Sequence, residues 1–138
     1  MFTELLALLV SYSGVFIGRL LKDIAKEEVR DGKKNLSLLQ SILFILTLIL
    51  FFYSVSGSAL YRIGLAILFA VIIYLLKNNY AILGIMFGLL PNTVLSVLIF
   101  LYGFPTGSLM GGSHKDVFKK TTIYLVLAVV TYIVTLLF

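Results

Sequence analysis

The chain has 138 residues, of which 61% are hydrophobic and only 12% are charged. This composition lies far outside the average for soluble domains and predicts a protein of the lipid bilayer. Eleven Lys and Arg residues against six Asp and Glu residues give a net charge of +5. Because most of these basic residues flank apolar runs, we interpret them as topology signals and lipid-headgroup anchors, and we expect no nucleic-acid partner.

The inventory of reactive side chains argues against catalysis. Cysteine is absent and His114 is the only histidine, so neither a thiolate nucleophile nor a His-rich metal site is expected within one chain. The six carboxylates lie outside the apolar runs or at their ends, which leaves no acid/base pair at bilayer depth. The glycine-rich stretch after Tyr102 lacks the GK[ST] ending of a phosphate loop. We therefore predict no catalytic residue, no cofactor and no metal.

The first apolar run, Phe2 to Leu21, has about 20 residues, the length that crosses a hydrocarbon core of about 30 Å. It lacks the cationic start and small-residue cleavage pattern of a signal peptide, so we expect a first membrane helix. Gly14 and Gly18 form a GxxxG pair, which predicts close packing against another helix. The helix is expected to continue to about Asp31 and to end at a left-handed Gly32.

Three further runs have the length and composition of spans. Leu36–Tyr53 and Ala59–Leu76 are joined by the polar turn 54–58 and should form an antiparallel hairpin. Thr121–Phe138 is the last predicted span. The stretch 103–120, which precedes it, contains four glycines and one proline and is expected to be too flexible for a regular element.

The fourth apolar segment, Tyr80 to Tyr102, differs because Pro91 and Asn92 lie at its middle. Proline removes a backbone donor and clashes with the preceding turn, and in lipid each freed polar group needs a partner inside the protein. Small or polar residues recur at every fourth position of this segment: Gly84, Gly88, Asn92 and Ser96. Such a stripe allows another helix to approach closely, or it lines a cavity.

The distribution of basic residues leaves the topology open. If all five apolar runs cross the membrane, seven Lys and Arg residues lie inside and four outside, a weak positive-inside bias. If the Pro91-Asn92 break is instead a re-entrant hairpin, Lys115, Lys119 and Lys120 also lie inside and the split becomes ten to one. A third solution is insertion in both orientations, followed by assembly of an antiparallel homodimer.

The motif Leu90-Pro91-Asn92-Thr93 resembles the crossover region of the auxin efflux carrier, or PIN-like, transporter family, and the order of five spans resembles one five-helix repeat of that family. In that family the fourth and ninth helices break near such prolines, beside an organic anion. The resemblance implies that Pro91 marks a crossover, that Asn92 is a nearby polar contact, and that a chain with one repeat functions as a homodimer.

The predicted fold is therefore a single all-α transmembrane domain over residues 1–138, multi-pass in the cell membrane. It has about five helices with the fourth broken at Pro91-Asn92, or four spans and a re-entrant hairpin.

We predict two functions of different classes. The first is an oligomeric, half-size transporter or channel that moves a small solute past the broken helix, with Pro91, Asn92, Thr93 and Ser96 as the substrate-binding residues. The second is a non-catalytic structural or accessory subunit. It would dock a larger membrane partner through the glycine faces of the first and fourth segments, which carry Gly14, Gly18, Gly84 and Gly88.

Overall fold

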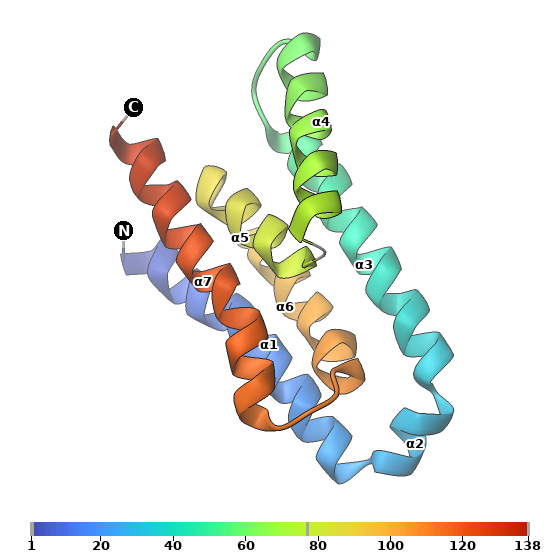
Figure 1. Ribbon diagram of the computed structural model, residues 1–138. Helices are drawn as coiled ribbons and strands as arrows, with labels where there is room; N and C mark the ends of the chain where they lie inside the picture. The colour runs from blue at the N-terminus through green and yellow to red at the C-terminus, as the bar shows by residue number, and fades with distance from the viewer. Residues whose placement is uncertain (1, 77, 138) are drawn as a thin grey trace.

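The computed structural model describes residues 2–76 and 78–137, and every regular element in that part of the chain is an α-helix (Figure 1). The predicted all-α class is thus confirmed. In chain order the helices are α1 (Phe2–Ile24), α2 (Lys26–Asp31), α3 (Lys33–Ser54), α4 (Ala59–Leu76), α5 (Asn79–Leu89), α6 (Thr93–Leu109) and α7 (His114–Leu137).

The predicted first helix is divided in two. Helix α1 ends at Ile24, the chain bends at Ala25, and the short α2 then leads to Gly32. The φ angle of Gly32 is −83°, so the predicted left-handed stop is wrong. Gly32 instead connects α2 to α3, which begins at the next residue, because its backbone conformation allows helical hydrogen bonding to resume without a loop.

The segment predicted to be too flexible is largely helical, which corrects that prediction. Helix α6 continues to Leu109 with Pro105 inside it, and α7 already begins at His114. Packing explains the difference: a Cβ on Gly103 would lie 2.5 Å from the backbone nitrogen of Val15, so this glycine is held against α1. Tertiary contact here outweighs the low helix propensity of glycine and proline.

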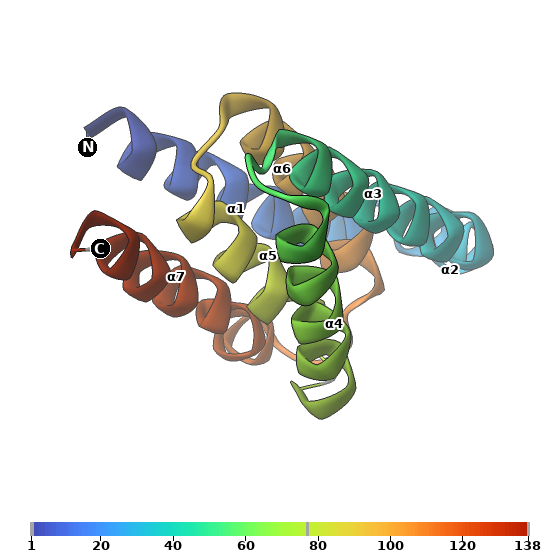
Figure 2. The same cartoon turned by 90° about the horizontal axis from the view of Figure 1, so that it is seen from above.

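The helices pack mainly in two pairs, α1 with α6 and α5 with α7, and α3 covers the other side of α6 (Figures 1 and 2). Helix α4 follows α3 after a tight connection and extends beyond the body of the molecule. Its bounds coincide with those of the predicted third span. The two ends of the chain lie at the same end of the molecule, at the upper left of Figure 1.

Aromatic and hydroxyl side chains occupy the centre of the fold. The rings of Tyr80 and Tyr102 pack at a centroid distance of 5.5 Å, and Tyr124 lies 6.2 Å from Tyr80. All three tyrosines are at most 2% exposed. The Tyr124 hydroxyl lies 2.6 Å from Oγ of Ser11 and so connects α7 to α1. The core of this strongly apolar chain is therefore partly polar.

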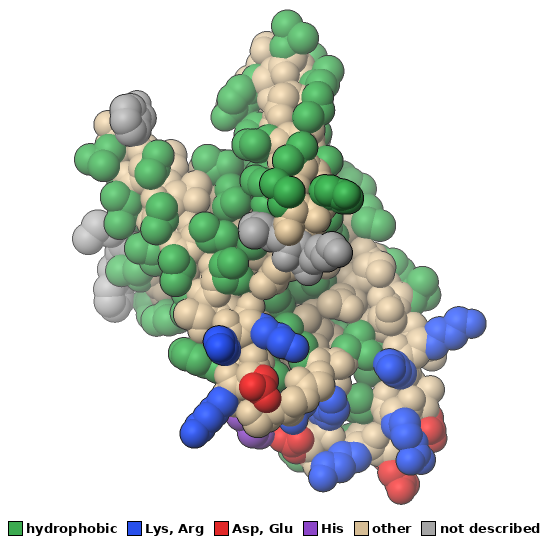
Figure 3. Space-filling model, viewed as in Figure 1, with side chains coloured by type: hydrophobic (Ala, Val, Ile, Leu, Met, Phe, Trp, Pro, Cys, Tyr) green, Lys and Arg blue, Asp and Glu red, His purple; other side chains and the backbone are tan. Residues whose placement is uncertain are grey.

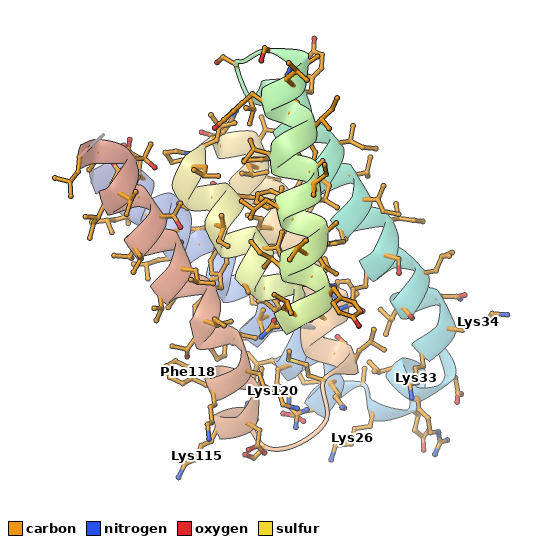
Figure 4. The ribbon with its side chains drawn as sticks, turned by 45° about the horizontal axis from the view of Figure 1, so that its top comes forward. Lys26, Lys33, Lys34, Lys115, Phe118 and Lys120 are labelled. Atoms are coloured by element: carbon orange, nitrogen blue, oxygen red, sulfur yellow. The ribbon has the colours of Figure 1, made fainter. Side chains whose placement is uncertain are left out.

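Three helices, α1, α3 and α7, are long and apolar enough to cross a membrane by length and composition. Helices α4, α5 and α6 are apolar but shorter. Large apolar side chains cover much of the outside, whereas Lys, Arg, Asp and Glu gather at the lower end in Figure 3. Figure 4 shows Lys26, Lys33, Lys115 and Lys120 at that same end, which we call the charged end.

Candidate functional site

Helices α5 and α6 form an antiparallel hairpin rather than one continuous helix. Helix α5 ends at Leu89 and α6 begins at Thr93, and the chain reverses between them (Figures 1 and 2). At the open end of this hairpin, Nδ2 of Asn79 donates a hydrogen bond of 3.2 Å to the hydroxyl of Tyr102. This contact joins the first residue of α5 to the middle of α6. In a kinked but continuing helix these two residues would lie far apart.

The turn of the hairpin contains three of the predicted substrate-binding residues. Asn92 is the N-cap of α6, and its Oδ1 accepts a hydrogen bond of 2.9 Å from the backbone N–H of Val94. Pro91 is half-buried beside it and Thr93 is exposed. Among the described residues, the amide Nδ2 of Asn92 has no hydrogen-bond partner, so the side chain keeps its N–H donors at the tip of the hairpin.

The fourth predicted substrate-binding residue, Ser96, is only 5% exposed. Its Oγ donates a hydrogen bond of 2.9 Å to the carbonyl oxygen of Asn92, which also accepts the Ser96 backbone N–H. Ser96 therefore serves the first turn of α6, and its donor is already used. The structure brings Asn92 and Ser96 together through local helix geometry.

The four predicted helix-packing glycines all lie at interfaces within the chain. A Cβ added to Gly14 or Gly18 would overlap the carbonyl oxygens of Phe100 and Phe104 on α6. The second pair, Gly84 and Gly88, faces α7. A Cβ added to Gly84 would lie 2.5 Å from the backbone carbonyl oxygen of Tyr124, and one added to Gly88 would lie 2.6 Å from that of Ala128. Helix α6 supplies a third pair that the sequence reasoning missed, Gly103 and Gly107, opposite α1. Its spacing of four residues was visible in the sequence.

A polar cavity of about 450 Å³ lies at the open end of the hairpin, between α3, α6 and the first turns of α5 and α7. We call it the hairpin-base cavity. Its lining residues are Gln40, Asn78, Asn79, Tyr80, Tyr102, Thr106, Met110 and Lys120. Gln40 reaches across from α3, and its Nε2 donates to the Tyr102 hydroxyl at 3.2 Å and to Thr106 Oγ1 at 3.0 Å.

Tyr80 gives the hairpin-base cavity an unsatisfied group. The side chain is 2% exposed, and its hydroxyl has no hydrogen-bond partner within the described part of the chain. A buried hydroxyl without a partner loses the hydrogen bonds it would make in water, which costs on the order of 1–3 kcal/mol. Tyr80 therefore brings a buried, unsatisfied hydroxyl to the wall of this cavity.

The charge of the lining limits the ligand class. Among the lining residues that the structure describes, Lys120 is the one charged residue and none is acidic. Asn78 fixes the α7 side of the cavity, because its Nδ2 donates to the Lys120 carbonyl oxygen at 3.1 Å. The cavity thus offers amide and hydroxyl groups near a single positive charge, which suits an uncharged polar molecule or an anion.

Sequence reasoning did not find this cavity, although one signal was available. Gln40 is the only glutamine in the chain and lies within an apolar run, where an amide requires a polar partner. Its partners, Tyr102 and Thr106, are 62 and 66 residues further along the chain. They also lie at the edge of, or within, a segment for which a flexible conformation was predicted.

The fold defines the class of the protein: all-α, with three helices able to cross a membrane and a helical hairpin enclosed by the others. No known family model, curated protein or solved structure matches the chain. The resemblance of residues 90–93 to auxin efflux carriers stays a prediction. In this structure those four residues connect two antiparallel helices.

Proposed function

We propose that the protein is a multi-pass protein of the cell membrane in which α1, α3, α4 and α7 cross the bilayer and the α5–α6 hairpin is re-entrant. Helix α5 has 11 residues and is about 16 Å long, roughly half the thickness of the hydrocarbon core. Both ends of the hairpin lie at the charged end. There, Nη1 of Arg19 donates to the Met110 carbonyl oxygen at 2.8 Å, and Asn78 contacts the first turns of α7.

The re-entrant arrangement supports a single orientation. It groups the basic residues of the α1–α3 connection with those at the start of α7, and leaves Arg62 of α4 at the opposite end. An excess of Lys and Arg at one end of a membrane protein favours the cytoplasmic side for that end, so we assign the charged end to the cytoplasm. A single orientation favours a homo-oligomer of parallel subunits over an antiparallel dimer, since the antiparallel dimer requires insertion in both directions.

Within this topology we propose that the protein is a transporter or channel for a small uncharged polar solute or a small anion. The observation that carries this proposal is the hairpin-base cavity with the unpaired, buried hydroxyl of Tyr80. Irregular backbone at membrane depth is tolerated where it is buried in protein or lines a water-filled cavity, and polar side chains in apolar segments mark solute pathways. We include Asn92, whose Nδ2 has no partner among the described residues, as a second polar contact for the solute at the hairpin tip.

A flux assay with defined solutes tests the proposal. The purified protein is reconstituted into vesicles, and swelling in glycerol or urea and influx of iodide are compared with those of protein-free vesicles. We expect flux of at least one class of solute. Replacing Gln40 with Leu should lower that flux by about tenfold, because it removes the amide that donates to the Tyr102 and Thr106 hydroxyls and makes the cavity less polar.

Ser41 provides the matched control. It follows Gln40 in α3, is exposed, and bonds only to its own helix through the Ser37 carbonyl oxygen. The variant Ser41→Leu should keep the wild-type flux. Equal flux through protein-containing and protein-free vesicles for all three probes would reject the proposal.

An accessory subunit that docks a larger membrane protein is the second candidate. The observation that favours it is the sparsely packed α4: Leu60 and Tyr74 are 81% and 79% exposed, and an added Cβ on Gly64 would meet nothing within 4 Å. The glycine pairs first predicted to dock a partner are occupied within the chain. On this hypothesis the partner binds α4, and copurification should fail when Gly64 is replaced with Phe.

A further inference from the structure

A second polar pocket, of about 210 Å³, lies at the charged end and is separate from the hairpin-base cavity. It is enclosed by the end of α1, by α2, by the first residue of α3 and by the end of α6. Its lining residues are Lys22, Lys26, Val29, Arg30, Lys33, Ser108 and Leu109. Four of the seven are cations and none is acidic, so we call it the basic pocket.

The sequence places these cations on one face. Lys22, Lys26 and Arg30 follow one another at intervals of four residues, and Lys33 comes three residues later, which is the spacing of neighbours on a helical surface. Of the acidic residues in this segment, Glu28 lines a neighbouring hollow, and Asp31 lines another one that also includes Arg30 and Lys33. The bends before and after α2 thus leave the four cations around one hollow.

The cations have few internal partners. Lys22 donates to the carbonyl oxygen of Met110 at 2.7 Å, and Arg30 lies 3.6 Å from Asp31 in a pair in which both side chains are more than 75% exposed. Within the described part of the chain, neither Lys26 nor Lys33 has a carboxylate within 4.0 Å. Figure 4 shows both side chains at the charged end. Four cations around a hollow with no acidic residue in its described lining attract an anion.

We propose that the basic pocket binds a phosphate group and that its source is the headgroup of an anionic phospholipid. Lysine and arginine bind phosphate oxygens through charge-assisted hydrogen bonds. Val29 and Leu109 put apolar surface beside the cations, as required where headgroups meet acyl chains. Basic pockets between membrane helices on the cytoplasmic side bind anionic headgroups in this way. The inference uses the membrane orientation given above but does not depend on transport.

Lipid retention measured by native mass spectrometry tests this site. The full chain is purified in detergent and titrated with phosphatidylglycerol, with phosphatidylcholine, and, in a separate arm, with inorganic phosphate. We expect phosphatidylglycerol to bind in a 1:1 complex and phosphatidylcholine not to compete. The combined variant Lys26→Gln/Arg30→Gln/Lys33→Gln should bind phosphatidylglycerol at least about tenfold more weakly, because it removes three of the four cations around the pocket.

The control variant removes the same number of charges elsewhere, as Lys34→Gln/Lys115→Gln/Lys119→Gln. None of these three residues lines the basic pocket, and we expect it to change binding by no more than about twofold. Circular dichroism melts show whether both variants fold. Equal losses in the two variants, or equal binding of the two lipids, would overturn the proposal. Displacement of lipid by millimolar inorganic phosphate would assign the site to a free phosphate and overturn the lipid source.

Discussion

Nδ2 of Asn79 and the hydroxyl oxygen of Tyr102 lie 3.2 Å apart, although 22 residues and a chain reversal separate them. The contact defines α5 and α6 as two arms of one hairpin. It also places the start of α5 beside Gln40 of α3, because Gln40 donates to the same hydroxyl. The base of the hairpin and the polar cavity are thus one structural unit.

The hairpin makes a direct prediction about topology. Cysteines at Asn35 and at Gly111 should both be protected from an impermeant reagent in intact cells and should both react after permeabilisation, since both lie at the charged end. The chain has no natural cysteine, so no background must be removed. A third probe at the exposed Ser56, in the α3–α4 connection, should react only from the other side. Labelling of 35 and 111 from opposite sides would contradict the re-entrant hairpin.

Gly103 should tolerate no side chain. A Cβ at this position would lie 2.5 Å from the Val15 backbone nitrogen, so Gly103→Ala must separate α1 from α6. We expect a loss of about 1–3 kcal/mol in the free energy of unfolding, measured by denaturant titration in detergent. The control Gly64→Ala adds a Cβ that meets nothing within 4 Å and should leave the protein as stable or more stable. Equal losses would contradict this packing.

The hydrogen bond between Ser11 and Tyr124 should contribute measurably to the α1–α7 contact. In a double-mutant cycle with Ser11→Ala and Tyr124→Phe, we expect a coupling of about 0.6 kcal/mol, the average for such bonds between membrane helices. Unfolding in mixed detergent measures the four stabilities. Tyr53→Phe is the control, since Tyr53 is 84% exposed, and it should change stability little. A coupling near zero would show that the bond makes no net contribution.

Asn92 should have two separable roles. Asn92→Asp keeps the N-cap oxygen that accepts from Val94, so the unfolding free energy should be unchanged within a few tenths of a kcal/mol. It removes the amide donor at the tip and should lower solute flux. Asn92→Leu removes both and should cost about 1 kcal/mol as well as flux. Wild-type flux through Asn92→Asp and Asn92→Leu would remove Asn92 from the solute path.

Asp116 should make stability depend on acid pH. Its carboxylate accepts hydrogen bonds from the backbone N–H and the hydroxyl of Ser113, at 2.7 and 2.9 Å, ahead of the apolar part of α7. These bonds, with smaller contributions from Lys120 and Lys119, hold the pKa of Asp116 below its ordinary value of 3.8. A lowered pKa means that this stabilisation is present above about pH 4 and is lost as the pH falls towards the folded-state value.

Thermal melts from pH 3 to pH 7 test this prediction. Asp116→Asn should be less stable than the wild type at pH 7, and the difference should shrink below about pH 4. Asp31→Asn, which removes a carboxylate from an exposed pair, is the control. A stability difference that is constant over the whole range would contradict the role of the ionised carboxylate.

The amino-acid sequence by itself determined the helical class, the apolar character and most helix positions. Ala59–Leu76 became α4 as predicted, because the length and composition of a membrane-type helix are local properties of the chain. The interruption of helical structure between Leu89 and Thr93 also has a local cause, since proline acts on its own preceding turn.

Only the tertiary structure decided what the chain does after that break and which residues meet. Whether α6 continues from α5 or returns beside it depends on contacts such as Asn79 with Tyr102, which no local pattern encodes. Gly103 and Pro105 looked like loop residues, but the close approach of α1 makes glycine the residue that fits in a helix there. The cavity needed Gln40, Tyr80 and Thr106 from three helices, and their meeting follows from packing over long sequence separations.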